Sequence, residues 1–169
     1  QKMTKGLPTS NMAKIGLTIS SQNPDVLYTA IELDRKKGAV YRSTDRGATW
    51  EKRSNTVSGA TGPHYYQELY SSPHKFDRLY LVDSRMQVSE DGGKTFRRMK
   101  EQNKHGDNHA IAFRSDDPDY LLVGTDGGLY ESFDLEENWR FMENMPITQF
   151  YKVAVDDAEP FYNIYGGTQ

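Results

Sequence analysis

Apolar and polar residues alternate along short segments of this chain, and turn-forming residues separate one segment from the next. Alternation with a period of two is typical of half-buried β-strands, and no segment keeps the longer period of an amphipathic helix. The pattern therefore predicts an all-β fold. The expected strands are 14–20, 26–33, 39–43, 49–53, 65–71, 78–82, 86–89, 95–99, 109–114, 120–124, 129–132, 138–142, 149–155 and 162–165.

Two sequence markers repeat along the chain in the same phase. The segment 43–50 reads STDRGATW, returns as SEDGGKTF at 89–96, and returns in a weaker form as SFDLEENW at 132–139, so that its aspartates are 46 and then 43 residues apart. Proline turns at Pro24, Pro73, Pro118 and Pro160 keep the same phase. A period of this length is typical of a four-stranded propeller blade, whereas a β-sandwich would not explain a fixed motif at a fixed period.

The repeat predicts about three and a half four-stranded antiparallel blades in one partial β-propeller domain spanning residues 1–169. The blades are expected at about 13–54, 64–100 and 108–143, and another begins at 149–169. Closed propellers have about four to eight blades, so we expect this segment to stay open. Its end sheets should then expose apolar faces that fit the remaining blades of a parent chain.

The repeated motif has a mechanical explanation. Its Ser and Asp side chains can bond local backbone donors, its Gly permits a left-handed conformation, and its aromatic residue can enter the apolar layer beneath. In the third copy Glu136 replaces the Gly, so either the turn changes there or Glu136 accepts strain of about 1 kcal/mol. The residues given this structural role are Ser43, Asp45, Gly47, Trp50, Ser89, Asp91, Gly93, Phe96, Ser132, Asp134 and Trp139.

Composition narrows the choice of partners. The net charge is -3 with no basic stripe, so a nucleic-acid partner is not expected. No apolar run is long enough to predict a membrane span. The chain has no cysteine, which excludes disulfides and thiolate chemistry. Its eleven tyrosines suit broad, half-buried sheet surfaces.

At the repeated motif the chain resembles the Asp-box (BNR) repeat propellers, which include sortilin-type receptors, xyloglucanase-like glycoside hydrolases and sialidases. The stretches 62–66, 105–110, 125–130 and 165–169 resemble a bacterial branch usually described as glycosyl hydrolase or sortilin-like. The resemblance implies a seven-bladed type of propeller and an extracytoplasmic (secreted or periplasmic) location. It specifies the fold better than the activity, because the same hairpin serves enzymes, receptors and assembly factors. Sialidase chemistry fits badly, because its Arg cluster and tyrosine nucleophile cannot be assigned here.

Strand alternation divides the turns of each blade between two edges. The proline turns and the Asp-boxes share one edge, and the second-to-third turns and the links between blades share the other. Propeller ligands usually lie where these links meet the first strands, which line the central channel. The residues expected there are the catalytic candidates Asp83, Asp107 and Asp126 and the ligand-binding candidates His64, Tyr65, Arg85, His105, His109, Gln149 and Tyr151.

The sharpest local cluster is the segment 105–109. If the segment is extended, its His-x-Asp-x-His pattern places His105, Asp107 and His109 on one side of the strand. That arrangement is compatible with a divalent metal, with a polar sugar site, or with a loop that bonds its own backbone. One short segment is thin support for a metal, so we predict no metal site and no cofactor. Asp83 and Asp126 also have a simpler explanation as turn caps.

Two functions fit these residues. The first is a glycan-directed propeller that hydrolyses or binds polysaccharide through the channel face; hydrolysis would need an acid and a base about 5 Å or about 6.5–9.5 Å apart. The second is a non-catalytic, sortilin-like module that binds a peptide or protein. The expected ligand is therefore a carbohydrate or a peptide.

Overall fold

The computed structural model describes residues 4–34, 37–56, 68–143, 145 and 150–168, which form fourteen strands and no helix. Three sheets have four antiparallel strands in sequential order, and the fourth has two. The first sheet contains β1 (Ile15–Ile19), β2 (Leu27–Asp34), β3 (Lys37–Ser43) and β4 (Glu51–Ser54). The second contains β5 (Glu68–Ser71), β6 (Leu79–Val82), β7 (Gln87–Ser89) and β8 (Arg97–Arg98). The third contains β9 (Asn108–Phe113), β10 (Leu121–Thr125), β11 (Gly128–Ser132) and β12 (Arg140–Phe141), and the fourth contains β13 (Phe150–Val155) and β14 (Ile164–Thr168).

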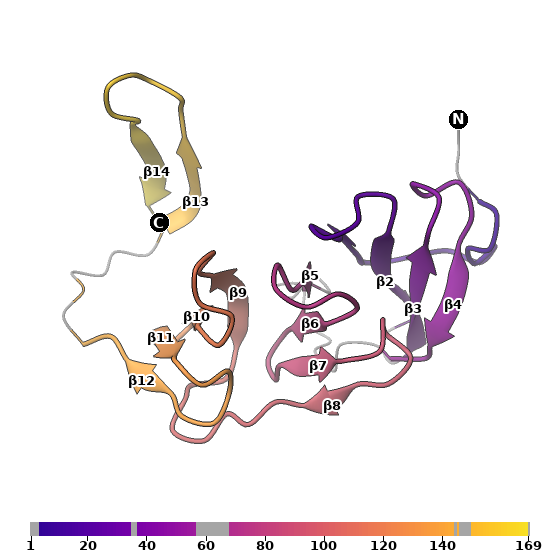
Figure 1. Cartoon of the computed structure of the whole chain (residues 1–169), viewed down its shortest axis with the longest axis horizontal. Helices are drawn as coiled ribbons and strands as arrows, with labels where there is room; N and C mark the ends of the chain where they lie inside the picture. The colour runs from indigo at the N-terminus through magenta and orange to yellow at the C-terminus, as the bar shows by residue number, and fades with distance from the viewer. Residues whose placement is uncertain (1–3, 35–36, 57–67, 144, 146–149, 169) are drawn as a thin grey trace.

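The three complete sheets follow one another in an arc (Figure 1), and their faces pack together. Alternate residues of the first and second sheets meet in one apolar cluster, and those of the second and third sheets meet in another. The predicted all-β propeller architecture is confirmed. The first cluster contains Val26, Tyr28, Ala30, Val40, Leu69, Leu79 and Leu81. The second contains Tyr80, Val82, Met86, Val88, Met99, Ile111, Leu121 and Val123.

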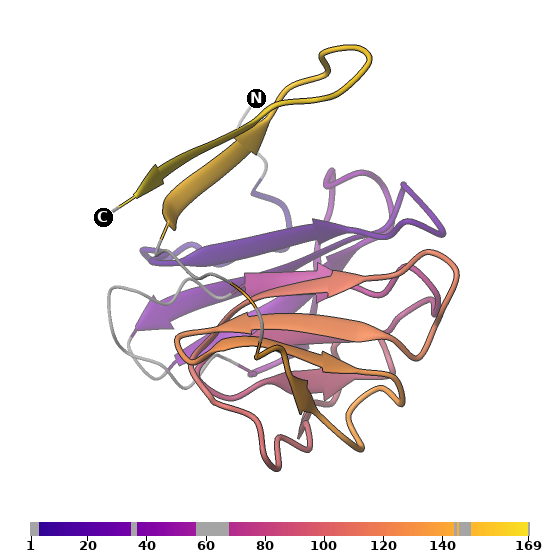
Figure 2. The same ribbon diagram turned by 90° about the vertical axis from the view of Figure 1, so that its left-hand side faces the viewer.

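Both ends of the arc carry exposed apolar side chains. On β1, the side chains of Ile15, Leu17 and Ile19 are each more than half exposed. At the other end, β13 and β14 contact each other but no other described strand, and they stand apart from the third sheet (Figures 1 and 2). Within the part of the chain that the structure describes, no helix is long and apolar enough to cross a membrane.

The first two Asp-boxes have the same hydrogen bonds. In the first box, Asp45 Oδ1 accepts from Ser43 Oγ and Thr49 N at 2.8 Å each, and Oδ2 accepts from Thr49 Oγ1 at 2.6 Å. Gly47 N donates to Ser43 Oγ at 2.8 Å. In the second box, Asp91 makes the equivalent contacts with its neighbours, and Gly93 takes the place of Gly47. These side chains are therefore occupied in holding their own hairpins.

The turn of the third box differs from the other two, because Glu136 stands where Gly47 and Gly93 stand. Leu135 keeps a positive φ of 65°, but Glu136 is not among the described residues with positive φ, and its N–H donates to Asp134 O at 2.9 Å. The Glu136 carboxylate is 8% exposed, accepts from Lys100 N at 2.7 Å and pairs with the Arg97 guanidinium. The substitution therefore removes the need for glycine and ties the third sheet to the second.

One backbone hydrogen bond recurs in all three complete sheets. The residue after the box aspartate donates its N–H to the carbonyl of an aspartate in the first-to-second turn of the same sheet. These bonds are Arg46 N to Asp25 O at 3.0 Å, Gly92 N to Asp77 O at 2.8 Å and Leu135 N to Asp119 O at 2.7 Å. Boxes and first-to-second turns therefore lie side by side at one edge, called here the box edge.

The box aromatics occupy equivalent positions but are half-buried rather than fully buried. Phe96 packs against the cluster between the first two sheets, and Trp139 packs against the cluster between the second and third. Trp50 packs with Leu7 against the outer face of the first sheet, and Trp50 N donates to Lys5 O at 3.0 Å. The residues around Lys5 thus cover part of the face that a preceding blade would cover.

Replacing Gly93 with alanine should destabilise the fold. Gly93 has φ 84°, and an added Cβ would lie 2.8 Å from Val40 Cγ1. The left-handed conformation and the overpacking together should cost at least about 2 kcal/mol in the free energy of unfolding, measured by urea denaturation. Gly167→Ala is the matched control, because an added Cβ there meets no atom within 4 Å. Equal losses in the two variants would contradict this explanation.

Acid should weaken the box hairpins. Hydrogen bonds from the Thr49 side chain and backbone lower the pKa of Asp45 to about 2, and bonds from Asn138 lower the pKa of Asp134. A depressed carboxyl pKa gives stability that is present above the unfolded pKa and lost as the pH falls through the folded pKa. The free energy of unfolding should therefore decrease between about pH 4 and pH 2. Urea titrations at several pH values should show a shallower decrease for Asp45→Asn, and an unchanged slope would argue against the box as its source.

Candidate functional site

The link between the second and third sheets runs along the edge opposite the box edge, and backbone hydrogen bonds hold it there. Asp107 N donates to Ser84 O at 3.0 Å, and Asn108 N donates to Asp83 O at 3.1 Å, both in the β6–β7 turn. Asp126 N, in the β10–β11 turn, donates to Asp107 O at 3.1 Å. The link and the two turns thus form one continuous surface, called here the loop edge.

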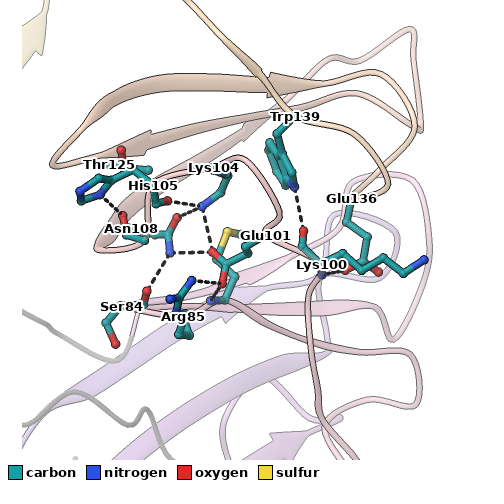
Figure 3. Close-up of polar contacts among 12 residues, drawn as sticks. Ser84, Arg85, Lys100, Glu101, Lys104, His105, Asn108, Thr125, Glu136 and Trp139 are labelled. Carbon is teal, nitrogen blue, oxygen red and sulfur yellow. Dashed lines mark hydrogen bonds and ion pairs between the residues drawn. The ribbon is translucent and has the colours of Figure 1, made fainter.

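Beneath the loop edge lies a buried polar network (Figure 3). Lys104 Nζ donates to Glu101 Oε1 at 2.8 Å and to His105 O at 2.9 Å, and it also contacts Asn108 Oδ1. Asn108 Nδ2 donates to Glu101 Oε1 at 3.1 Å and to Asp83 O at 2.7 Å. The side chains of Lys104 and Glu101 are 0% and 5% exposed. Because these polar atoms have partners, the network fixes the conformation of residues 101–108.

Burial affects the pKa of Lys104, the cation of this network. Desolvation lowers the pKa of Lys104, and the hydrogen bond and charge of Glu101 oppose that effect. The Lys104 ammonium also lies 5.3 Å from the centre of the Trp139 ring, so the aromatic residue of the third box closes one side of the network. Lys104 therefore contacts both the aromatic residue of the third box and the network beneath the loop edge.

The segment 105–109 does not meet the condition for the one-sided His-x-Asp-x-His arrangement, because it is not extended over its whole length. Strand β9 begins only at Asn108, and Asp107 has φ 50°. Consequently His105, Asp107 and His109 do not share one side of a strand. His105 Nδ1 lies 2.8 Å from Gly106 O, whereas His109 Nε2 lies 2.8 Å from Asp126 Oδ1. Among the described residues, no group of three or more His, Asp or Glu could hold a metal ion.

The His109–Asp126 pair is an exposed part of the loop edge. The two side chains are 42% and 61% exposed, and they join the first strand of the third sheet to its β10–β11 turn. The exposed His105 ring lies over Gly127, where an added Cβ would be 2.7 Å from His105 Cγ. Two imidazoles and a carboxylate thus present several hydrogen-bonding groups on one small surface.

The β6–β7 turn places its two candidate residues differently. Asp83 is 1% exposed, and its Oδ1 accepts from Ser84 N at 2.5 Å, so this carboxylate shapes the turn from inside. Arg85 is exposed and approaches Glu101 at 4.0 Å. An added Cβ on Gly106 would lie 3.8 Å from the Arg85 guanidinium, so Arg85 borders the loop edge beside His105.

Four candidate residues from the sequence cannot be placed in this site. His64, Tyr65 and Gln149 lie outside the described residues. The backbone of Tyr151 lies in β13, but its side chain is not described.

The sequence candidates did not include the three residues that carry the network, Glu101, Lys104 and Asn108. A charged residue in a polar link is normally solvated, so composition gives no reason to bury it. One signal was present: Asn108 follows a predicted link and opens a strand, which is a position where a side-chain amide often bonds local backbone.

Removing the buried cation should be costly. Lys104→Met leaves the Glu101 carboxylate buried without its main partner, and we expect a loss of about 3–5 kcal/mol in the free energy of unfolding. The matched control is Lys100→Met, because the Lys100 side chain is 60% exposed and pairs with exposed Glu137. That variant should lose at most about 1 kcal/mol in the same urea denaturation experiment. Similar losses in both would show that the network does not stabilise the link.

The chain is similar in sequence to one curated enzyme and in structure to several solved propellers. The chain is 30% identical over 156 residues to the oligoxyloglucan-reducing end-specific xyloglucanase of Emericella nidulans, covering 85% of the chain and 19% of that enzyme. The GH74 xyloglucanase from Xanthomonas campestris superposes with a TM-score of 0.62 at 19% identity, over 83% of this chain and 25% of the enzyme. YCF48 from Cyanidioschyzon merolae superposes with a TM-score of 0.53 at 18% identity, over 81% of this chain and 39% of that protein.

These likenesses differ in what they show. The solved structures share the fold, and the chain spans less than a third of the length of the two xyloglucanases. The family model described as sortilin, neurotensin receptor 3, matches residues 38–163, which is most of the chain and includes all three Asp-boxes and the loop edge. The chain therefore belongs to the Sortilin-Vps10 family of propeller proteins.

Proposed function

We propose that this chain is part of a glycan-directed propeller that binds polysaccharide at its loop edge. The observation that carries the proposal is the exposed His109–Asp126 pair, which stands beside His105 and Arg85 on a link held by a buried network. The similarity to a xyloglucanase over 85% of the chain supports a sugar ligand. An exported setting, implied by the family resemblance, is part of the same proposal.

The chemistry of the loop edge suits a neutral sugar. Hydroxyl groups both donate and accept, so they can bond the imidazoles of His105 and His109, the Asp126 carboxylate and the Arg85 guanidinium together. A platform whose backbone is already fixed loses little conformational freedom on binding. Glu101 and Lys104 therefore act as positioning residues, because they hold the link beneath the side chains that would contact the ligand.

Hydrolysis would need a further condition, two carboxyl groups that flank one glycosidic bond. Asp126 is exposed and Asp107 is half-buried, so both remain candidates for the acid and base. Asp83 is a weaker candidate, because its carboxylate is 1% exposed and bonds the turn that contains it. A second carboxylate from another part of the parent protein would serve equally well.

The alternative is a module that binds a peptide or protein without turnover. Two observations favour it: the family match to sortilin, neurotensin receptor 3, and the likeness to a YCF48 structure bound to D1 peptide, with a TM-score of 0.52 at 18% identity. In that case the same loop edge would bond the backbone and side chains of an extended peptide. The two proposals differ in ligand, and one titration series separates them.

The test is calorimetric titration of the chain with xyloglucan oligosaccharides and, separately, with neurotensin. We expect oligosaccharide binding that weakens roughly tenfold in Asp126→Asn and in His109→Ala, because each loses a hydrogen-bonding group at the ligand. Asp116→Asn is the matched control, since Asp116 is an exposed aspartate on the box edge that pairs with Arg114. The control should bind like the unmodified chain.

Two outcomes would contradict the glycan proposal. Neurotensin binding that is lost in Asp126→Asn, with no oligosaccharide binding, would favour the peptide-binding alternative. Equal weakening of oligosaccharide binding in Asp126→Asn and Asp116→Asn would show that the ligand does not bind at the loop edge. A reducing-end assay on the same samples then reports whether binding is accompanied by hydrolysis.

A further inference from the structure

The chain contains the dipeptide Asp–Gly twice, and in both places a second glycine follows. The two copies are Asp91–Gly92–Gly93 in the second box and Asp126–Gly127–Gly128 in the β10–β11 turn. An aspartate before a glycine is prone to isomerise, because a residue without Cβ leaves its backbone nitrogen open to the preceding carboxyl group. Since the two copies share their local sequence, a difference in their reactivity must come from the structure.

The isomerisation begins with an attack of the backbone on a side chain. The nitrogen of the glycine forms a bond to Cγ of the aspartate, and the OH of the carboxyl group leaves with the amide hydrogen as water, which gives a cyclic succinimide. Water then adds to either carbonyl carbon of the ring. Breaking the bond from nitrogen to Cγ restores aspartate. Breaking the bond from nitrogen to the backbone carbonyl carbon gives isoaspartate, in which the main chain runs through the former side chain.

The copy in the second box is held away from this reaction. Asp91 Oδ1 accepts from Ser89 Oγ at 2.9 Å and from Thr95 N at 2.9 Å, and Oδ2 accepts from Thr95 Oγ1 at 2.7 Å. Burial favours the neutral acid, but these hydrogen bonds outweigh it and lower the pKa of Asp91, so the form that loses water is rare. The attacking group is occupied as well, because buried Gly92 donates its N–H to Asp77 O at 2.8 Å. The attack would therefore break several bonds of the box at once.

The copy in the β10–β11 turn is accessible. The Asp126 side chain is 61% exposed, and Gly127 is exposed too. Asp126 Oδ1 lies 2.8 Å from His109 Nε2, and Gly127 donates its N–H to a side chain, Thr125 Oγ1, at 3.0 Å. The attack therefore requires only a local opening of an exposed turn, and the packed sheets can stay together.

Packing also explains why glycine stands at the accessible copy. An added Cβ on Gly127 would lie 2.7 Å from Cγ of His105, whose ring rests on this turn. A larger residue would shield the Asp126 carboxyl group from attack, but it would displace that ring. The reactive dipeptide is thus a consequence of the way in which the loop edge is packed.

We propose that Asp126 is a site of spontaneous isomerisation to isoaspartate in the folded protein, and that Asp91 is protected. The product places Cβ of residue 126 in the main chain and moves the carboxylate, so it separates this carboxylate from His109. The reaction does not depend on the ligand proposed above, but it removes one of the groups that would bond that ligand. The loop edge therefore changes with the age of the molecule, while the second box keeps its shape.

The test compares the two copies within one molecule. The full chain is incubated in mildly acidic buffer and digested with trypsin, which separates the peptides 86–94 and 115–140. Mass spectrometry with fragmentation that distinguishes the isomers should find isoaspartate forming at Asp126 at least about tenfold faster than at Asp91. In guanidinium chloride, where both copies are unfolded, the two rates should become similar.

Asp126→Glu is the matched control, because glutamate keeps the negative charge but closes a larger ring more slowly. After incubation of the folded chains, an isoaspartyl methyltransferase should transfer methyl groups from S-adenosylmethionine to the unmodified chain and not to this variant.

Equal rates at Asp126 and Asp91 in the folded chain would overturn the proposal, and so would isoaspartate that forms only after unfolding. The proposed function is tested separately on the same samples. An aged chain that carries isoaspartate at residue 126 and still binds xyloglucan oligosaccharides unchanged would support the modification and contradict the proposed binding site.

Discussion

Each of the three complete sheets is closed at the box edge by one repeated hydrogen bond. In each sheet the residue after the box aspartate donates its N–H to a carbonyl in the first-to-second turn, at 2.7–3.0 Å. This bond joins the two turns at one end of a sheet, and the box side chains hold one of those turns in a fixed shape. The bond therefore fixes the two turns, and the second and third strands that run between them, at the box edge. The box is therefore a structural device whose aspartates bond their own hairpin.

The described part of the opposite edge does not contain this hydrogen bond. Between the second and third sheets, a buried network of Glu101, Lys104 and Asn108 holds the link in place. That network leaves exposed side chains above it, including His109 and Asp126. The box edge therefore holds each sheet, and the proposed recognition site lies at the loop edge, above a network that also stabilises the link.

The sequence predicted the parts of the structure that depend on local pattern. Strand alternation and the phase of the boxes were enough to predict four-stranded sheets, because both signals are carried by neighbouring residues. The site was harder to predict. Asn108 bonds the carbonyl of Asp83, which is 25 residues away, and no local pattern reports such a contact. The positive φ of Asp107 also breaks the alternation that had grouped His105 with His109.

The third box also shows what local sequence cannot predict. The replacement of glycine by Glu136 raised a question that the sequence left open, namely strain or a changed turn. The structure answers it through a partner in another sheet, because the carboxylate meets the Arg97 guanidinium and the backbone of Lys100. Local sequence could identify the departure from the pattern, but only the packed sheets explain why it is tolerated.

If the two edges of the sheets have different roles, a ligand should change the amide chemical shifts of the loop edge and leave those of the box edge unchanged. The measurement is a titration of the isotope-labelled chain with xyloglucan oligosaccharides, followed by NMR. We predict shifts in the amides of residues 84–85, 105–109 and 126–127, with the box hairpins at 43–50, 89–96 and 132–139 unchanged. Shifts concentrated in the box hairpins, with the loop edge unaffected, would contradict the account.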